Sequence, residues 1–141
     1  MFLGEYRHQL DAKNRVRVPA KLKVELGESF VITKGSSGCL FMFNQKTMET
    51  LYDKLSNVPI SDVAAQKSVR SLFSAGAEVD NDDQGRFLLP QNLKDFAKID
   101  KNIVFIGAGN RIEIWSEENW NSNNKIDDFD TVLSGLSKFG V

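Results

Sequence analysis

Asp11-Ala-Lys-Asn-Arg15-Val-Arg-Val-Pro19 is matched 71 positions later by Asp82-Asp-Gln-Gly-Arg86-Phe-Leu-Leu-Pro90. In both stretches an aspartate precedes an arginine by four positions, alternate positions are apolar after the arginine, and a proline follows. Because this offset is about half of the 141-residue chain, the sequence predicts two copies of one unit laid end to end. Two copies are too few for a solenoid, so we expect one duplicated domain.

The length and composition are those of a globular domain. A chain of 141 residues with 41% hydrophobic and 26% charged residues can bury a sizeable core. No apolar segment reaches the ~20 residues that a membrane-spanning helix needs, and the residues after Met1 do not resemble a signal peptide. Cys39 is the only cysteine and cannot form an intrachain disulfide, which is typical of a reducing compartment. We therefore expect a cytoplasmic protein without a membrane anchor.

Charge is distributed unequally between the two copies. Residues 1–24 hold six basic and two acidic residues, a net charge of +4, whereas the matching residues 72–95 hold two basic and five acidic residues, a net charge of −3. The formal net charge of −1 for the whole chain hides this difference. A segment that keeps its pattern while its charge diverges this far is expected to face solvent or a partner. If the partner is anionic, the first copy is expected to meet it, since its charge is that of a phosphate-binding surface.

The same order of elements is predicted in each copy. An extended segment leads into the Asp-x-x-x-Arg turn, a short strand follows, and the proline stands at the start of a short helix. The turn contains Asn14 in the first copy and Gly85 in the second, and both residue types tolerate left-handed backbone. The extended segments are predicted at residues 2–10 and 73–81, and the helices at residues 20–26 and 91–97.

A glycine-rich hairpin is predicted to close each copy, because apolar runs typical of strands flank each group of glycines. In the first copy the strands are residues 30–33 and 40–43 around the turn Gly35-Ser-Ser-Gly38. In the second copy they are residues 103–106 and 112–115 around Gly107-Ala-Gly-Asn110.

Further helices are predicted after the hairpins and between the copies. Asn44 and Ser116 are expected to cap the helices that follow them, since their side chains accept hydrogen bonds from the free N–H groups of a first turn. One helix is predicted over residues 45–56 and another over residues 62–73, whereas residues 121–124 are predicted to be a loop. An apolar face on the tail, which we expect to pack, is formed by Phe129, Val132, Leu133 and Leu136.

The residues give little support to catalysis. His8 is the only histidine and Cys39 the only cysteine, too few for an imidazole–thiolate metal site. The sequence lacks the Gly-x-Ser-x-Gly turn of many serine hydrolases, and its glycine-rich segments lie between strands, outside the context of a nucleotide-binding loop. We therefore predict no enzyme activity, no cofactor, no metal and no small-molecule substrate. His8 is expected at the surface or the core edge, Trp115 in the core, and Trp120 in helix packing.

The Asp-x-x-x-Arg turn has a structural and a functional interpretation. In the first, the aspartate caps the turn and the arginine pairs with a carboxylate. In the second, the arginine of the first copy protrudes beside basic neighbours and contacts DNA phosphates or the acceptor edge of guanine. Because the turn occurs twice, part of its role must be structural. The structural role is favoured for Asp11, Asp82 and Arg86, the last because its surroundings are acidic, and both roles stay open for Arg15.

Taken together, these residues resemble the MraZ family, whose members are built from two SpoVT-AbrB-like repeats. The opening Phe2-x-Gly4-x-Tyr6-x-His8-x-Leu10-Asp11-x-Lys13-x-Arg15 is similar to the start of that family. The second repeat resembles it in Ala77-Glu78-Val79, Asp82-x-Gln84-Gly85-Arg86, and Val104-x-Ile106-Gly107-x-Gly109-Asn110-Arg111-Ile112-Glu113-Ile114-Trp115. The resemblance places the repeats at residues 5–47 and 76–119, linking helices at 48–75 and a C-terminal helical tail at 120–141.

The resemblance implies an α+β fold, a duplicated swapped-hairpin β-barrel of the SpoVT-AbrB-like type with pseudo-two-fold symmetry and flanking helices. It also implies a ring-shaped homo-oligomer that presents several DNA-binding loops at once. Weak binding by one basic turn would then be strengthened by effective concentration.

The function implied by the resemblance is sequence-specific regulation of transcription. Such a nucleoid-associated regulator binds short direct repeats in double-stranded promoter DNA upstream of its own gene, at the head of the division and cell-wall gene cluster. The family's DNA contacts carry over to Lys13, Asn14 and Arg15, although glycine is usual at the position of Asn14. We add Arg17 from the basic window and Arg86 as the counterpart in the second turn, while Gly85 stays a structural turn residue.

Two other classes of function fit parts of the sequence. An oligomeric scaffold without sequence-specific DNA binding would use the duplicated turns only as structure and the basic window to bind an acidic protein. An antitoxin of the related AbrB-like type would carry a disordered toxin-binding tail, for which the short amphipathic segment at residues 129–136 is a poor match.

Overall fold

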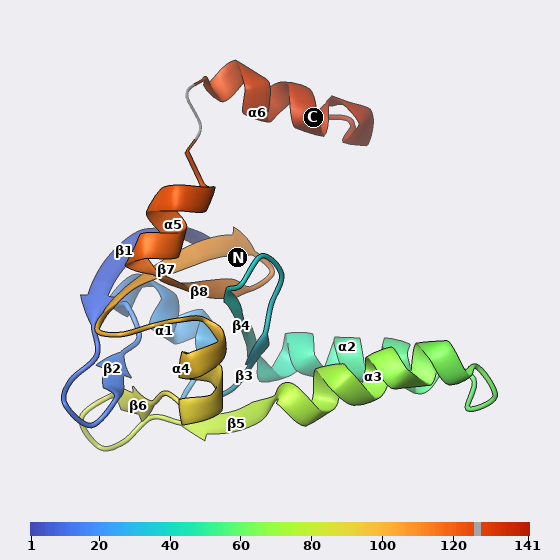
Figure 1. The fold of residues 1–141 in the computed structure, drawn as a ribbon, viewed down its shortest axis with the longest axis horizontal. Helices are drawn as coiled ribbons and strands as arrows, with labels where there is room; N and C mark the ends of the chain where they lie inside the picture. The colour runs from blue at the N-terminus through green and yellow to red at the C-terminus, as the bar shows by residue number, and fades with distance from the viewer. Residues whose placement is uncertain (126–127) are drawn as a thin grey trace.

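The computed structural model describes residues 1–125 and 128–141, and these form eight β-strands and six α-helices (Figure 1). The strands are β1 (Phe2–Gln9), β2 (Arg15–Arg17), β3 (Ser29–Lys34), β4 (Leu40–Asn44), β5 (Ala77–Asp80), β6 (Arg86–Leu88), β7 (Asn102–Gly109) and β8 (Ile112–Ser116). The helices are α1 (Ala20–Leu26), α2 (Gln45–Ser56), α3 (Val63–Ala75), α4 (Gln91–Phe96), α5 (Glu117–Asn123) and α6 (Phe129–Leu136), and a short 3-10 helix (Ser137–Phe139) follows α6.

Local sequence explains where most helices begin. The Asn44 side chain accepts a hydrogen bond from the Thr47 N–H at 2.9 Å, and the Ser116 hydroxyl accepts one from the Asn119 N–H at 3.1 Å, so both predicted caps are confirmed. Helices α1 and α4 each start directly after a proline, at the point where a missing N–H is tolerated. The helices predicted over residues 20–26 and 45–56 are α1 and α2.

The strands of the two copies interlock in one antiparallel sheet. Its order is β1-β7-β8-β4-β3-β5, and a separate two-stranded ribbon pairs β2 with β6. The first strand of each copy pairs with the hairpin of the other copy, β1 with β7 and β5 with β3. Exchanging each strand for its counterpart in the other copy gives the same order read in reverse, as a pseudo-two-fold axis requires. The α+β class is confirmed. The predicted closed barrel is not formed by this pairing, since β1 and β5 lie at opposite, unpaired edges of the sheet.

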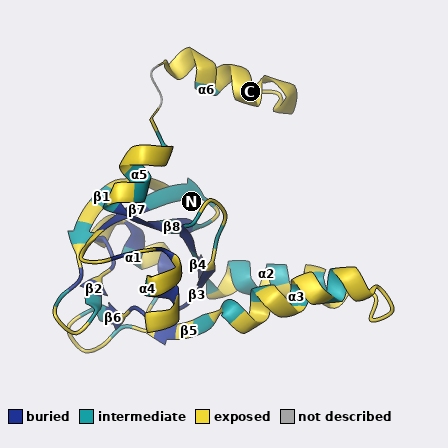
Figure 2. Ribbon diagram, in the orientation of Figure 1, coloured by how far each residue is buried: buried dark blue, intermediate teal, exposed yellow. Residues whose placement is uncertain are grey.

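One hydrophobic core is shared by the two copies (Figure 2). Phe87 on the ribbon is 1% exposed, and its ring packs edge-on against Phe30 at 5.3 Å and Phe105 at 6.4 Å between centroids. Phe30 belongs to the first hairpin and Phe105 to the second, so a single aromatic side chain joins both hairpins to the ribbon. Trp115 is buried and Trp120 packs against it at 5.6 Å, as predicted.

The second hairpin differs from its prediction. Strand β7 runs through Gly107 to Gly109, so most of the predicted turn is strand, and Gly107 pairs with Gly4 of β1. A Cβ on Gly107 would lie 2.3 Å from the backbone nitrogen of Leu3. The absence of a side chain at Gly107 therefore lets the two strands approach closely. From the sequence alone, a glycine in this role looks the same as a glycine in a turn.

Three other predictions are wrong at helix ends or in the tail. Helix α3 continues to Ala75, past the predicted start of an extended segment at residue 73, and α5 includes residues 121–123, which were predicted to be loop. In α6, Phe129 is 70% exposed and Leu133 45%, so the apolar face of the tail does not pack on the domain (Figure 2). The predicted tail also spans residues 126–127, which lie outside the described residues.

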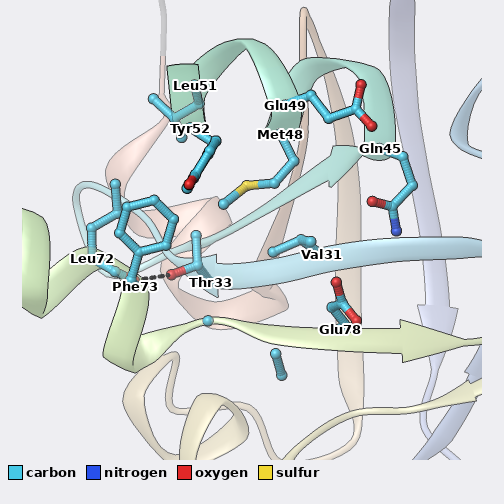
Figure 3. A pocket seen from close by; sticks show the side chains of 12 residues that line it. Val31, Thr33, Gln45, Met48, Glu49, Leu51, Tyr52, Leu72, Phe73 and Glu78 are labelled. Atoms are coloured by element: carbon cyan, nitrogen blue, oxygen red, sulfur yellow. Dashed lines mark hydrogen bonds between the residues drawn. The ribbon is translucent and has the colours of Figure 1, made fainter. Parts of the chain in front are cut away.

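The α2–α3 pair projects from the sheet and leaves an apolar groove at its base (Figures 1 and 3). The Thr33 hydroxyl donates to the carbonyl of Leu72 at 3.3 Å, which ties α3 to β3. The groove is lined mainly by Val31, Met48, Leu51, Tyr52, Leu72 and Phe73. Within the described residues, no helix has the length and apolar character needed to cross a membrane.

Replacing Phe87 tests whether the ribbon anchors the core. We expect Phe87→Ala to lower the free energy of unfolding by about 3–5 kcal/mol, because it leaves a cavity between the two hairpins. Leu88, its 57% exposed neighbour, is the control, and Leu88→Ala should change stability by less than about 0.5 kcal/mol. Urea denaturation followed by circular dichroism measures both, and similar losses in the two variants would contradict the assignment.

Candidate nucleic-acid interface

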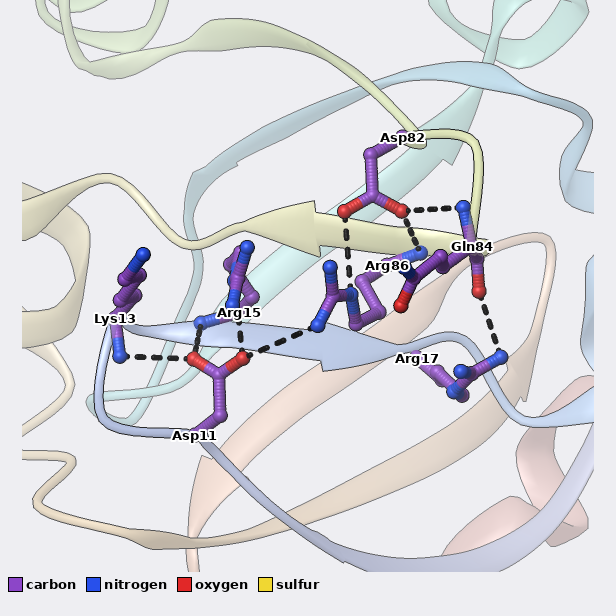
Figure 4. Close-up of polar contacts among 7 residues, drawn as sticks. All are labelled: Asp11, Lys13, Arg15, Arg17, Asp82, Gln84 and Arg86. Atoms are coloured by element: carbon purple, nitrogen blue, oxygen red, sulfur yellow. Dashed lines mark hydrogen bonds and ion pairs between the residues drawn. The ribbon is translucent and has the colours of Figure 1, made fainter.

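The antiparallel ribbon brings the two Asp-x-x-x-Arg turns together, one at each of its ends (Figure 4). Val16 pairs with Phe87 at its centre, and both side chains are buried. Because successive side chains of a strand point to opposite faces, the residues flanking this central pair point away from the core. Arg17 pairs with Arg86, so basic residues of both copies meet on one surface.

In the first turn a single carboxylate organises the backbone. Asp11 Oδ1 accepts hydrogen bonds from the N–H groups of Lys13 at 2.9 Å and Arg15 at 2.8 Å, and Asp11 Oδ2 accepts one from Arg15 Nε at 2.9 Å. Asn14 has φ +61°, the left-handed conformation predicted for it. The side chain of Lys13 is not held in this network and stays exposed.

The second turn repeats this geometry. Asp82 Oδ1 accepts from the N–H groups of Gln84 and Arg86, both at 2.9 Å, and Asp82 Oδ2 accepts from Arg86 Nε at 3.2 Å. Gly85 has φ +75° and fills the left-handed position of Asn14. The structural role predicted for the two aspartates therefore has a direct geometric basis in both copies.

These contacts favour the ionised form of each aspartate. The hydrogen bond from the Arg15 N–H, together with that from Lys13 and the Arg15 guanidinium, lowers the pKa of Asp11 below its ordinary value. The Arg86 N–H, the Gln84 N–H and the Arg86 guanidinium lower the pKa of Asp82 in the same way. Both turns are therefore preorganised as charged structures at neutral pH.

The two arginines differ in how far their charge is neutralised. Arg86 lies between two carboxylates, with Nε on Asp82 at 3.2 Å and Nη1 3.8 Å from Asp11. Arg15 pairs with Asp11 through Nε at 2.9 Å, and within the described residues its terminal nitrogens have no protein partner. The Arg15 side chain is also more exposed, at 31% against 23% for Arg86. Arg15 is therefore better placed to contact an external anion.

Arg17 links strand β2 to the second turn. Its Nη1 donates to the backbone carbonyl of Gln84 at 2.6 Å (Figure 4). The corresponding position in the second copy is Leu88, so this contact occurs only once in the duplicated fold. Arg17 thus has a structural contact in addition to the DNA role predicted for it.

The side chain of Asn14 is directed to the helix of the other copy. Its amide nitrogen donates to Gln91 Oε1 at 3.3 Å, and its Oδ1 accepts from Lys94 Nζ at 2.9 Å. Lys94 was not among the predicted site residues, and it lies in the acidic window of residues 72–95. The signal was present, however, since Lys94 is the 71-residue counterpart of Lys23 in the basic copy.

Two side chains outside the ribbon, Cys39 and His8, have shifted pKa values. Burial raises the pKa of the Cys39 thiol to about 12, which keeps it protonated and unreactive. His8 is half-buried against Phe105 at 5.4 Å, at the core edge as predicted, and burial lowers its pKa. Within residues 1–125 and 128–141, no group of three or more histidine, cysteine or acidic side chains is arranged to hold a metal ion.

Comparison with known families agrees with the duplication. A family model described as "MraZ protein, putative antitoxin-like" matches residues 1–71 and again residues 72–128. The chain belongs to the MraZ family. The first match ends at residue 71, which equals the 71-residue offset from which the duplication was inferred.

Relatives in the MraZ family match over most or all of their length. A protein of Clostridium beijerinckii named "Transcriptional regulator MraZ" is 48% identical over 142 residues, covering 100% of both chains. A protein of the same name from Carboxydothermus hydrogenoformans is 48% identical over 122 residues, covering 86% of this chain and 85% of its own. Another, from Syntrophomonas wolfei, is 41% identical over 143 residues, covering 100% of both chains.

The lowered pKa values predict an acid-sensitive fold in this MraZ chain. Because the folded pKa of Asp82 lies below the unfolded value of about 3.9, its stabilising contribution is full above that value and is lost as the pH falls through the folded pKa. We expect the urea midpoint of Asp82→Asn to fall less steeply than that of the wild type between about pH 5 and pH 2. Asp83→Asn, at the adjacent exposed aspartate, is the control and should follow the wild type. Parallel curves for wild type and Asp82→Asn would contradict the role of this carboxylate.

Proposed function

We propose that the protein is a sequence-specific, DNA-binding regulator of transcription without enzyme activity. Its double-stranded DNA target is the set of short direct repeats upstream of its own gene, at the head of the division and cell-wall gene cluster. The proposal is supported by membership of a family whose relatives are named transcriptional regulators. The single observation that carries it is the partly exposed, incompletely neutralised Arg15 on a preorganised turn.

The first turn is the primary DNA contact in this proposal. Lys13 and Arg15 stand on it with one carboxylate, Asp11, whereas the second turn holds Asp82 and Asp83 around Arg86. A duplex carries dense negative charge, so it approaches the more basic end of the ribbon. Lys13 then contacts phosphates, and Arg86 contributes chiefly to the stability of the ribbon.

Arg15 can contribute to sequence recognition because it is partly held. Asp11 fixes the guanidinium through Nε, so little rotamer freedom is lost when the terminal nitrogens bind. Two such nitrogens match the N7 and O6 acceptors of guanine in the major groove, and they fit phosphate oxygens equally well. Arg17 adds positive charge on the same strand but at the second turn, where it keeps its contact with Gln84.

We further propose that the protein acts as a ring-shaped homo-oligomer, with repeats at residues 5–47 and 76–119 in each subunit. Support comes from large apolar side chains that one chain leaves exposed in α6: Phe129, Leu133 and Leu136. Contiguous exposed apolar surface of this kind marks an interaction site. Several first turns on one assembly could then bind successive DNA repeats on one face of the duplex, if the repeats are spaced by about one helical turn, ~10 base pairs.

Arg15→Ala separates the DNA-binding role from the structural one. We expect it to weaken binding to the upstream DNA at least about tenfold, because it removes the proposed base or phosphate contact. Its melting temperature and oligomeric mass should stay close to those of the wild type. Electrophoretic mobility shift against scrambled DNA at two salt concentrations, with circular dichroism melting, measures these effects.

Arg86→Ala is the matched variant, since Arg86 fills the same place in the second turn. It leaves two carboxylates without their shared cation, so we expect it to lower the melting temperature more than Arg15→Ala does. The DNA-binding proposal fails if the wild-type protein does not prefer the upstream DNA to scrambled DNA. That result would favour a scaffold that binds an acidic protein.

A charge in the apolar face of α6 tests the oligomer. We expect Leu133→Glu to shift the protein to a smaller mass in size-exclusion chromatography with light scattering, because the interface would have to bury a charge. Lys138→Glu places the same charge just after the helix, at an exposed polar position, and should leave the mass unchanged. An unchanged mass for Leu133→Glu would show that this face is not an interface.

A further inference from the structure

Helix α4 of the second repeat carries a lysine into the first turn. Lys94 Nζ donates to Asn14 Oδ1 at 2.9 Å, although the two residues are 80 positions apart. Asn14 is itself oriented, since its amide nitrogen donates to Gln91 Oε1 at 3.3 Å and Gln91 Nε2 donates to Asp95 Oδ1 at 2.8 Å. The ammonium group is therefore held at a defined position beside the turn that carries Arg15.

The charge of Lys94 is not paired with a carboxylate among the described residues. Its partner is a neutral amide, and among the described residues no carboxylate lies within 4.0 Å of its Nζ. By contrast, Arg15 pairs with Asp11 at 2.9 Å and Arg86 with Asp82 at 3.2 Å. An ammonium group has three donors, and the bond to Asn14 uses one of them. Two oriented donors on an uncompensated cation remain for an external acceptor.

The equivalent lysine of the first repeat is arranged differently. Lys23 lies next to Gly85 of the second turn, where a Cβ would be 3.1 Å from its Nζ. Glycine offers no side-chain acceptor, and Lys23 instead lies 3.9 Å from Glu28 Oε1. The duplication has therefore placed a lysine beside each turn, but only the first turn holds its lysine through an amide that leaves the charge intact.

We propose that Lys94 contacts a DNA phosphate as part of the first-turn interface, and that Asn14 is a positioning residue for it. This inference rests on the proposed DNA-binding function and extends its interface to the second repeat. Each first turn would then present Lys13, Arg15 and Lys94, two residues from one repeat and one from the other. A phosphate contact strengthens binding without reading sequence, because phosphates are the same at every base pair.

Lys94→Gln tests the contact through its salt dependence. Each phosphate neutralised by a lysine contributes about 0.9 to the slope of log affinity against log salt concentration. We expect Lys94→Gln to lower that slope by about one for each subunit bound, and affinity near 0.1 M salt by roughly five- to tenfold per contact. The preference for upstream over scrambled DNA should be unchanged. Fluorescence anisotropy with both duplexes over a series of KCl concentrations measures all three quantities.

Lys23→Gln is the matched control, since it removes the same charge at the equivalent position beside the other turn. We expect its slope, affinity and melting temperature to stay close to those of the wild type. Asn14→Gly keeps the left-handed backbone of the turn but releases Lys94, so its loss of affinity should be smaller than that of Lys94→Gln. Lys94→Arg restores the charge and should recover the slope, which separates loss of contact from loss of folding.

The outcomes distinguish this inference from the function on which it rests. If the wild-type protein does not discriminate upstream from scrambled DNA, the proposed function fails. If it discriminates and Lys94→Gln keeps the wild-type slope, the function stands and the Lys94 contact is wrong. An equal loss of slope in Lys23→Gln would also overturn the inference, because the effect would then be one of net charge.

Discussion

The pairing of β2 with β6 is the constraint on which the rest of the structure depends. It places Val16 opposite Phe87, and Phe87 packs against Phe30 of one hairpin and Phe105 of the other. The burial of this pair joins both repeats in one core. The same pairing sets one turn at each end of the ribbon, with the flanking side chains directed away from the core. Stability and the candidate interface therefore originate in one short ribbon.

Because the turn is duplicated, both copies can keep its backbone geometry while their surface charges differ. Asp11 and Asp82 organise their turns through the same set of hydrogen bonds, even though the surrounding charge has opposite sign. Because the carboxylate fixes the backbone, the neighbouring side chains are free to differ, as Arg17 and Leu88 do. The result is a ribbon that is symmetric in backbone and asymmetric in charge, with its basic end at the first turn.

Sequence reasoning succeeded where the cause is local and failed where it is not. The left-handed backbone of Asn14 and Gly85, the caps at Asn44 and Ser116, and the duplication itself were predicted from residue type and spacing. Gly107 was misassigned to a turn because glycine serves both turns and close strand approach, and only the neighbouring strand distinguishes them. The tail was misjudged for a similar reason, since an amphipathic pattern shows that a helix has an apolar face but does not identify what covers it.

The sequence by itself determined that the chain is a duplicated α+β domain of the MraZ family with a basic first turn. These properties are recorded in residue identity, in the 71-residue offset and in the local distribution of charge. The tertiary structure alone decided that the repeats interlock, that Arg86 is shared by two carboxylates, and that Lys94 reaches the first turn. All of these contacts join residues that are distant in the sequence, as Lys94 and Asn14 are at 80 positions apart, and only packing of the whole chain brings them together. No local pattern specifies such contacts, because the energy that selects them is that of the shared core.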